Sequence, residues 1–242
     1  MISPLLPIPA SAHASELDTI TLLVHLLMAV LALGWGGFFV YTLVRFRRAR
    51  NPRADYTGVR SRASTWTEAA VVLAELLLLV GFSIPAWATR VRDIPASPET
   101  VTIRVVAEQF AWSVHYPGAD RVFGLRAISL VSAENPIGLD PASFGAADDV
   151  TASNEVVVPL GRPVVVQLSA KDVIHSFGVP AMRVKQDAIP GMTTTVWFTP
   201  TRLGDFDIAC SQLCGLGHYR MRGVVRVLPE AEFEAWLAAQ RR

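Results

Sequence analysis

The sequence predicts two membrane-spanning helices followed by an all-β domain, either a sandwich or a small barrel. Of the 242 residues, 51% are hydrophobic, and the mean hydropathy of +0.36 is high for a soluble domain. Two long apolar segments stand in the first part of the chain. Beyond about Pro98 the pattern changes to short alternating runs separated by turn residues, which is typical of β-structure.

The first apolar segment runs from about Ile20 to Val44, and the second from about Trp66 to Ala88. A helix needs roughly 20 mostly apolar residues to cross a bilayer, and both segments supply them. A core helix of a soluble protein rarely stays apolar on every face over such a length. We therefore expect a transmembrane hairpin within residues 20–92, and its second span carries an acid, Glu75, in the interior. An acid at that depth is costly, and we expect it to be protonated and hydrogen-bonded to a neighbouring helix.

Basic residues predict the orientation of this hairpin. Linker 45–65 carries one acid, Asp55, and is otherwise rich in arginine: Arg45, Arg47, Arg48, Arg50, Arg53, Arg60 and Arg62. Such short loops stay in the cytoplasm, so both termini are expected outside. Residues 1–19 lack the basic region of a signal peptide and are interpreted as an external leader, with cleavage after Ala12-His13-Ala14 as the open alternative.

Residues 93–242 are expected to form the external β domain, entered through a short linker with Pro95 and Pro98. Its predicted strands are 101–105, 112–116, 155–158, 164–168, 194–198, 206–209 and 223–228. The stretch 117–154 is long, irregular and rich in turn residues. We interpret its acids Asp140, Asp148 and Asp149 as a solvated loop in preference to a cation site.

The C-terminal stretch 229–242 predicts a short docking helix. Acids stand in its first turn and Arg241 and Arg242 in its last, as the helix dipole favours. Phe233, Trp236 and Leu237 fall on one face, which we expect to pack on the domain or on a partner.

The segment Cys210-Ser211-Gln212-Leu213-Cys214-Gly215-Leu216-Gly217-His218-Tyr219-Arg220-Met221 places two thiols, an imidazole and a thioether within twelve positions. His175 stands 35 residues upstream. Thiolate, imidazole and thioether form a soft donor set that favours copper. Cys214, His218, Met221 and His175 would satisfy a one-copper site, and Cys210 is then surplus. A second thiolate facing the first allows two coppers to share both sulfurs, which suits one-electron transfer.

Two other interpretations compete for these residues. The only two cysteines of the chain could form a disulfide outside the cytoplasm, but His218 and Met221 would then have no role. Zinc could take both cysteines with His175 and His218, but zinc has no use for the thioether of Met221. Five soft donors at these offsets therefore favour copper.

The segment resembles the binuclear copper A motif of cytochrome c oxidase subunit II, Cys-Ser-Glu-x-Cys-Gly-x-x-His-x-x-Met. Asp172–Phe177 and Lys185–Gly191 resemble the family's stretches around the first histidine. The resemblance implies a cupredoxin-like domain in which Cys210 and Cys214 bridge two coppers, His175 and His218 bind one each, and Met221 is axial. The main-chain carbonyl of Gln212 is the other axial donor. The family's glutamate at that position reaches a magnesium ion at the interface with subunit I, so Gln212 leaves this ion an open question.

Gln109-Phe110-Ala111-Trp112 resembles the aromatic patch through which cytochrome c delivers its electron in that family. Phe110 takes the place of the usual entry tryptophan, and Trp112 stands nearby. Because the two rings occupy alternate positions of an expected strand, we expect both to lie on one face. Phe110 and Trp112 are thus the candidate electron-entry residues.

The resemblance implies the electron-entry subunit of a haem–copper oxidase, which takes electrons from a c-type cytochrome or another periplasmic carrier. It would pass them to the haem of subunit I, where oxygen is reduced to water. It further implies a bacterial inner-membrane protein, with the lipid bilayer, subunit I and other oxidase subunits as partners. The net charge of +1 argues against nucleic acid. A copper A subunit of a nitric-oxide reductase, a copper-free quinol oxidase subunit and a copper carrier or assembly protein are the alternatives.

Overall fold

The computed structural model describes residues 6–53, 56–58 and 61–240, and these fall into two compact units. The first unit comprises residues 16–89, and the second comprises residues 6–15 with 90–240. Four residues of the predictions above, Asp55, Arg60, Arg241 and Arg242, lie outside the described residues.

In the described part of the chain, three helices and one π-helical turn precede the first strand. Helix α1 spans Ala14–Arg45 and α2 spans Ala63–Leu78, and the second helix continues through a π turn, Leu79–Ser83, into α3, Ile84–Arg92. Both continuous helical segments, 14–45 and 63–92, are long and apolar enough to cross a membrane. They begin before and end after the predicted spans, because polar helix-forming residues extend each apolar stretch.

The π turn stands just before Pro85. A proline inside a helix has no N–H to donate and clashes with the carbonyl four residues earlier, so the regular ladder cannot pass through it. The hydroxyl of Ser83 donates to the carbonyl of Leu78 at 3.4 Å and satisfies one acceptor of this turn. The wider turn therefore lets one helical segment continue past a residue that normally ends a helix.

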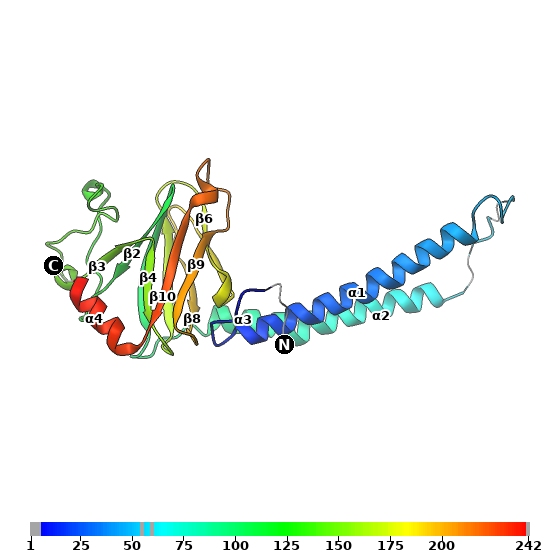
Figure 1. Ribbon diagram of the computed structural model, residues 1–242, viewed down its shortest axis with the longest axis horizontal. Coiled ribbons are helices and arrows are strands. Elements are labelled where there is room, and N and C mark those ends of the chain that lie inside the picture. The colour runs from blue at the N-terminus through cyan, green and yellow to red at the C-terminus, as the bar shows by residue number, and fades with distance from the viewer. Residues whose placement is uncertain (1–5, 54–55, 59–60, 241–242) are drawn as a thin grey trace. The chain divides into compact units, whose positions relative to one another are not determined.

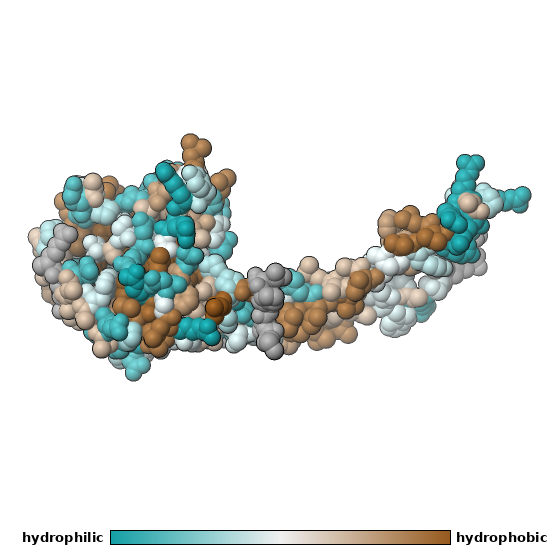
Figure 2. Space-filling view, in the orientation of Figure 1, coloured by the Kyte–Doolittle hydropathy of each residue, from teal (hydrophilic) through white to brown (hydrophobic). Residues whose placement is uncertain are grey.

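Helices α1 and α2 lie side by side in the first unit (Figure 1). They line a shared apolar groove with Leu27, Leu31 and Phe38 from α1 and Ala70 and Ala74 from α2. Most of the other large apolar side chains on both helices are exposed, as the brown surface along them shows in Figure 2. Glu75 is exposed as well. This surface needs an apolar surrounding, either lipid or the helices of a partner.

The second unit is a β-sandwich of two five-stranded sheets, and this confirms the predicted fold class (Figure 1). The first sheet has the order β3-β2-β1-β5-β8 and the second the order β4-β10-β9-β6-β7. The strands are β1 Val101–Glu108, β2 Ala111–Tyr116, β3 Val150–Ser153, β4 Glu155–Pro159, β5 Val164–Ala170, β6 His175–Val179, β7 Val184–Ala188, β8 Thr194–Phe198, β9 Gly204–Cys210 and β10 Arg222–Leu228.

Seven of these strands coincide with predicted runs, and three were not predicted. β3 lies inside the stretch expected to be irregular from 117 to 154, so that expectation was wrong at its end. β6 and β7 were not predicted either, because neither shows an alternation of polar and apolar residues. Every residue of β6 is buried, which removes the alternation of polar and apolar residues on which the prediction depended. In β7 polar residues occupy all three central positions.

The inner faces of the two sheets form one core. Ile103 and Val105 of β1 and Leu168 of β5 face Phe177 of β6 and Val225 of β10, and all five are fully buried. The ring of Trp112 lies edge-on to Phe177 with the centroids 5.6 Å apart, so the core contact reaches the end of the sandwich where β6 begins.

Loop 117–154 covers the outer face of the first sheet. The buried side chain of Asp149 contacts His115 at 2.6 Å and accepts the amide of Gly124 at 2.8 Å. Burial lowers the pKa of His115, although Asp149 opposes this shift. Asp149 is therefore neither solvated, as the sequence suggested, nor arranged with other acids around a cation. It anchors the loop to β2.

Residues of the predicted external leader pack on the β domain. The amide of Ala10 donates to the carbonyl of Ala181 and that of Thr201 to the carbonyl of Ala10, both at 2.8 Å. The hydroxyl of Ser11 donates to Met182 at 2.7 Å. His13 lies against the ring of Trp197, and burial, followed by the charge of Arg90, lowers its pKa to about 4. Residues 6–15 of the predicted leader are thus part of the second unit, whereas residues 16–19 belong to α1 in the first unit.

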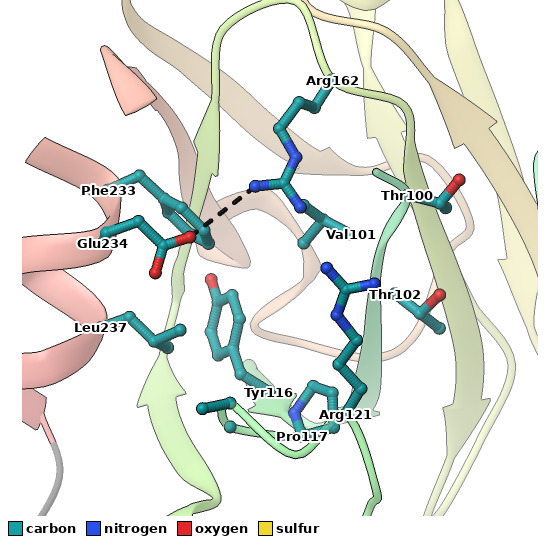
Figure 3. Close-up of a pocket in the computed structure, with 12 residues that line it drawn as sticks. Thr100, Val101, Thr102, Tyr116, Pro117, Arg121, Arg162, Phe233, Glu234 and Leu237 are labelled. Carbon is teal, nitrogen blue, oxygen red and sulfur yellow. Dashed lines mark ion pairs between the residues drawn. The ribbon is translucent and has the colours of Figure 1, made fainter. Parts of the chain in front are cut away.

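The C-terminal helix α4, Glu230–Gln240, docks on the sandwich as predicted, with Phe233 and Leu237 buried. Figure 3 shows Arg162 pointing toward this helix, where it pairs with Glu230 at 2.5 Å and Glu234 at 3.7 Å. A hollow of about 320 Å³ lies beside this contact.

Tyr116 lies at the base of the same hollow and joins the sheets by its hydroxyl. It donates to the carbonyl of Val157 at 3.1 Å and accepts from the amide of Val157 at 2.7 Å.

Tyr116→Phe leaves both buried backbone groups without a partner, so we expect the free energy of unfolding to fall by about 1 to 3 kcal/mol. Thermal unfolding of the full chain in detergent measures this. Tyr56→Phe, at a site 93% exposed, is the control and should change nothing. An equal shift for both would contradict the assignment.

Candidate metal centre

The candidate ligands meet at one end of the second sheet. Cys210 is the last residue of β9, and loop 211–221 leads from it to β10. β6 pairs with β9 in antiparallel register, with Phe177 opposite Cys210, and this places His175 next to Cys210 although 35 residues separate them. In Figure 1 this loop is the orange segment that joins β9 and β10.

The five side chains predicted as ligands form a continuous chain of contacts. The sulfurs of Cys210 and Cys214 lie 3.8 Å apart. His175 Nδ1 lies 4.0 Å from the Cys210 sulfur, and His218 Nδ1 lies 3.6 Å from the Cys214 sulfur. The thioether of Met221 lies 3.7 Å from Cys214. Each thiol thus has its own imidazole.

Two glycines allow the loop to take this path. Gly215 has a φ of +125°, which side chains rarely adopt. A Cβ on Gly217 would lie 2.4 Å from the ring of Phe110, so only glycine fits against that ring. The side-chain amide of Gln109 donates to the carbonyl of Cys214 at 2.6 Å and ties the loop to the β1–β2 turn.

Asp172 orients His175. Its carboxylate contacts Nε2 of His175 at 2.9 Å and leaves Nδ1 facing the sulfurs. Burial alone would raise the pKa of Asp172, but hydrogen bonds from His175 and from the amides of Gln109 and Val173 lower it below its usual value. A carboxylate behind an imidazole in this way fixes its tautomer and its direction toward a metal.

The site is closed to solvent on most sides. His175 is fully buried, and Cys210, Cys214 and Met221 are at most 9% exposed, while His218 is half-buried. Burial, followed by the adjacent Cys210 sulfur, raises the pKa of the Cys214 thiol to about 11. Two thiolates side by side are therefore unfavourable unless a cation compensates their charge. A buried thioether in the set favours a soft metal over zinc.

Comparisons with known proteins identify the family of the chain. Residues 101–228 match the family model for cytochrome c oxidase subunit II, periplasmic domain. The chain belongs to the cytochrome c oxidase subunit II family. It is 34% identical to alternative cytochrome c oxidase subunit 2 of Bradyrhizobium diazoefficiens over 84% of this chain and 73% of that protein. It is 31% identical to cytochrome c oxidase subunit 2 of Cereibacter sphaeroides over 96% of this chain and 78% of that protein.

A solved structure is also similar, the periplasmic domain of subunit II of cytochrome oxidase of Bradyrhizobium japonicum. It shares 33% identity, with 61% of this chain and 96% of that chain covered and a TM-score of 0.45. As a member of the subunit II family, the chain is one subunit of a cytochrome c oxidase, an oxidoreductase.

The two candidate entry residues, Phe110 and Trp112, differ in position and in burial. Phe110 lies in the turn before β2 and is half-buried against Gly215 and Gly217. Trp112 is fully buried in the core, edge-on to His175 with the centroids 6.2 Å apart. A strand begins one residue after Phe110, so alternation does not relate the two rings. Trp112 has no surface on which a donor could dock, and Phe110 remains the entry candidate.

The main-chain carbonyl of Gln212 lies in the site, although the residue as a whole is exposed to solvent. Its main-chain carbonyl accepts the Cys210 thiol at 3.2 Å and points into the site, while the residue itself is exposed. Asp172 and Gln109 support the site, and the sequence prediction did not assign them. Asp172 contacts His175, 3 positions away in the sequence, and Gln109 contacts Cys214, 105 positions away.

Gln212→Ala tests the carbonyl assignment. Because the carbonyl persists in any substitution, we expect the copper spectrum and copper content of the full chain to stay nearly unchanged. Gln109→Ala is the matched comparison, since it removes the amide that holds Cys214, and we expect weaker copper retention during dialysis against a chelator. Loss of copper in Gln212→Ala alone would show that the side chain ligates.

Proposed function

We propose that this chain is the electron-entry subunit of its oxidase, with a binuclear copper A centre held by His175, Cys210, Gln212, Cys214, His218 and Met221. The observation that carries the proposal is the paired arrangement of donors. Two sulfurs lie 3.8 Å apart, and each has its own imidazole within 4.0 Å. A one-copper site of Cys214, His218, Met221 and His175 would leave the thiol of Cys210 unused.

Bound copper would supply one-electron storage shared between two ions, and the protein supplies the rigid frame. Cys210 and Cys214 would bridge the ions, and His175 and His218 would bind one each. Met221 and the Gln212 carbonyl would be the weak axial donors. Asp172 holds His175 in place, and the buried surroundings exclude water, so the ligands need little rearrangement when the charge changes.

The alternatives are less well supported. A copper carrier or assembly protein needs a site from which the metal exchanges, whereas Cys214 and Met221 are at most 3% exposed. A quinol oxidase subunit of this architecture would have no use for the complete donor set. The two relatives named above are cytochrome c oxidase subunits, which favours an oxidase over a nitric-oxide reductase.

We further propose that the helical hairpin anchors the chain in a bacterial inner membrane, with loop 45–65 in the cytoplasm and the copper domain outside. The exposed apolar faces of α1 and α2 would contact lipid, subunit I and other oxidase subunits. The oxygen-reducing site would lie in subunit I.

The exposed amide of Gln212 can offer an oxygen to a magnesium ion but no charge, so such an ion would depend on carboxylates of the partner.

Copper content tests the binuclear centre. We expect two coppers per full-length chain in detergent, and an EPR spectrum of one electron shared over two copper nuclei after oxidation. Cys210→Ser removes one bridge and should reduce the content to one copper or none. One copper with an ordinary blue-site spectrum in the unaltered chain would refute the binuclear assignment.

Phe110 tests the entry route. Its half-buried ring lies against the loop at Gly215 and Gly217, which carries Cys214 and His218. Phe110→Ala should slow reduction of the copper by a protein donor at least several-fold, because a ring that bridges the tunnelling gap is removed. Stopped-flow absorbance measures the rate, and an unchanged copper spectrum shows that the site is intact. Phe144→Ala, at an 85% exposed position of loop 117–154, is the control. An unchanged rate in Phe110→Ala would place the entry elsewhere.

A further inference from the structure

The apolar groove between α1 and α2 is a hollow that the two helices leave unfilled. Its volume is about 870 Å³. The α2 side is lined mostly by small side chains, among them Ala63, Ala70 and Ala74. On the α1 side Gly34 leaves further space, since a Cβ added there would contact no atom of α2 within 4 Å. Small residues on both helices thus keep open a channel that another apolar molecule can fill.

The groove is about as long as one leaflet of a bilayer is thick. It extends along α1 from Leu27 to Phe38 and along α2 from Ala63 to Ala74. Each stretch rises about 16 Å along its helix, which is roughly half the thickness of a hydrocarbon core. A neighbouring transmembrane helix would contact the hairpin through both leaflets, whereas an acyl chain lies within one. The length of the groove therefore favours an acyl chain.

The end of the groove beside loop 45–65 is polar and basic. Ser61 and Ser64 line it there, and Arg62 stands between Ser61 and Ala63 in the sequence. The helices diverge toward this end in Figure 1, and Figure 2 shows a hydrophilic surface next to the apolar one. Six exposed arginines gather on this side of the first unit: Arg45, Arg47, Arg48, Arg50, Arg53 and Arg62.

Acids do not balance this charge. Within the described part of residues 41–70, Glu68 is the one acid, and its carboxylate accepts a hydrogen bond from Ser64 at 2.9 Å. None of the six arginines forms an ion pair with any residue that the structure describes. Asp55 and Arg60, outside the described residues, carry one charge of each sign. The apolar groove thus ends at a surface of net positive charge.

We propose that the groove binds an acyl chain of an anionic phospholipid of the cytoplasmic leaflet, with the phosphate of its headgroup at Arg62 and the hydroxyls of Ser61 and Ser64. The inference rests on the proposed membrane anchor and its orientation. A guanidinium matches the geometry of a phosphate, and each arginine near a membrane surface favours an anionic lipid by about five-fold. Phosphatidylcholine carries its own cation beside the phosphate, so the arginines would favour it less.

Photolabelling of the purified oxidase tests the site. The enzyme is delipidated in detergent and then supplied with phosphatidylglycerol or phosphatidylcholine at equal concentration, each with a diazirine in one acyl chain. We expect phosphatidylglycerol to label the peptides that contain Gly34 and Ala70 at least about five-fold more strongly at low salt. The preference should shrink at high salt, because ions screen the exposed arginines.

Two pairs of variants separate the acyl chain from the headgroup. Ala70→Leu fills the groove and should reduce labelling of the Gly34 peptide by both lipids several-fold, whereas Ala69→Leu makes the same change outside the lining and should not. Arg62→Gln should reduce the preference for phosphatidylglycerol by about five-fold. Arg202→Gln removes the same charge at an exposed site of the second unit and should leave the preference unchanged. Unchanged circular dichroism shows that each variant is folded.

Three results would contradict the inference, and they differ in what they refute. Equal labelling by both lipids at low salt would refute the anionic class of the ligand. Labelling of the groove in the isolated full-length chain but not in the oxidase would show that another subunit fills it. In both cases the membrane anchor stands. Release of the chain from membranes by alkaline carbonate would refute the anchor itself.

Discussion

The pairing of β6 with β9 is the contact on which the candidate metal centre depends. Phe177 lies opposite Cys210 in this register, and His175 is therefore carried to the sulfur of Cys210. A shift of one residue would turn His175 to the other face of the sheet and leave the cysteine loop with a single imidazole. The contact of Phe177 with Trp112 in the core favours this register, since a slip of one residue would turn the Phe177 ring to the other face of the sheet.

The same end of the sandwich combines a rigid interior with an apolar surface. Trp112 packs between Phe177 and His175, and Asp172 binds the far side of the His175 ring, so this ligand is supported by the core itself. Loop 211–221 is held by Gln109 and by the ring of Phe110, while its leucines remain exposed. A site built in this way can keep its donors fixed and still offer a surface for brief contacts with a partner.

The surfaces of the helical hairpin and of the β domain suit two different surroundings. Side chains on α1 and α2 are apolar and exposed all around, which suits hydrocarbon or neighbouring helices. In the sandwich, several buried polar groups have specific partners, such as the Tyr116 hydroxyl with Val157 and Nε2 of His115 with Asp149. This division allows one chain to be anchored in a membrane and to hold a water-excluding metal site outside it.

The sequence by itself determined the two spans, the β character of the second domain and the set of soft donors. Each depends on residues close together in the chain: runs of apolar residues, alternating pairs, and the spacing from Cys210 to Met221. Only the tertiary structure decided that His175 meets Cys210, that Asp172 orients it, and that Trp112 is core while Phe110 lies in a turn. It also decided that Asp149 binds His115 and that Ala10 packs beside Ala181. These contacts join residues that other strands bring together, and local periodicity carries no information about such pairings because they are set by sheet register and core packing.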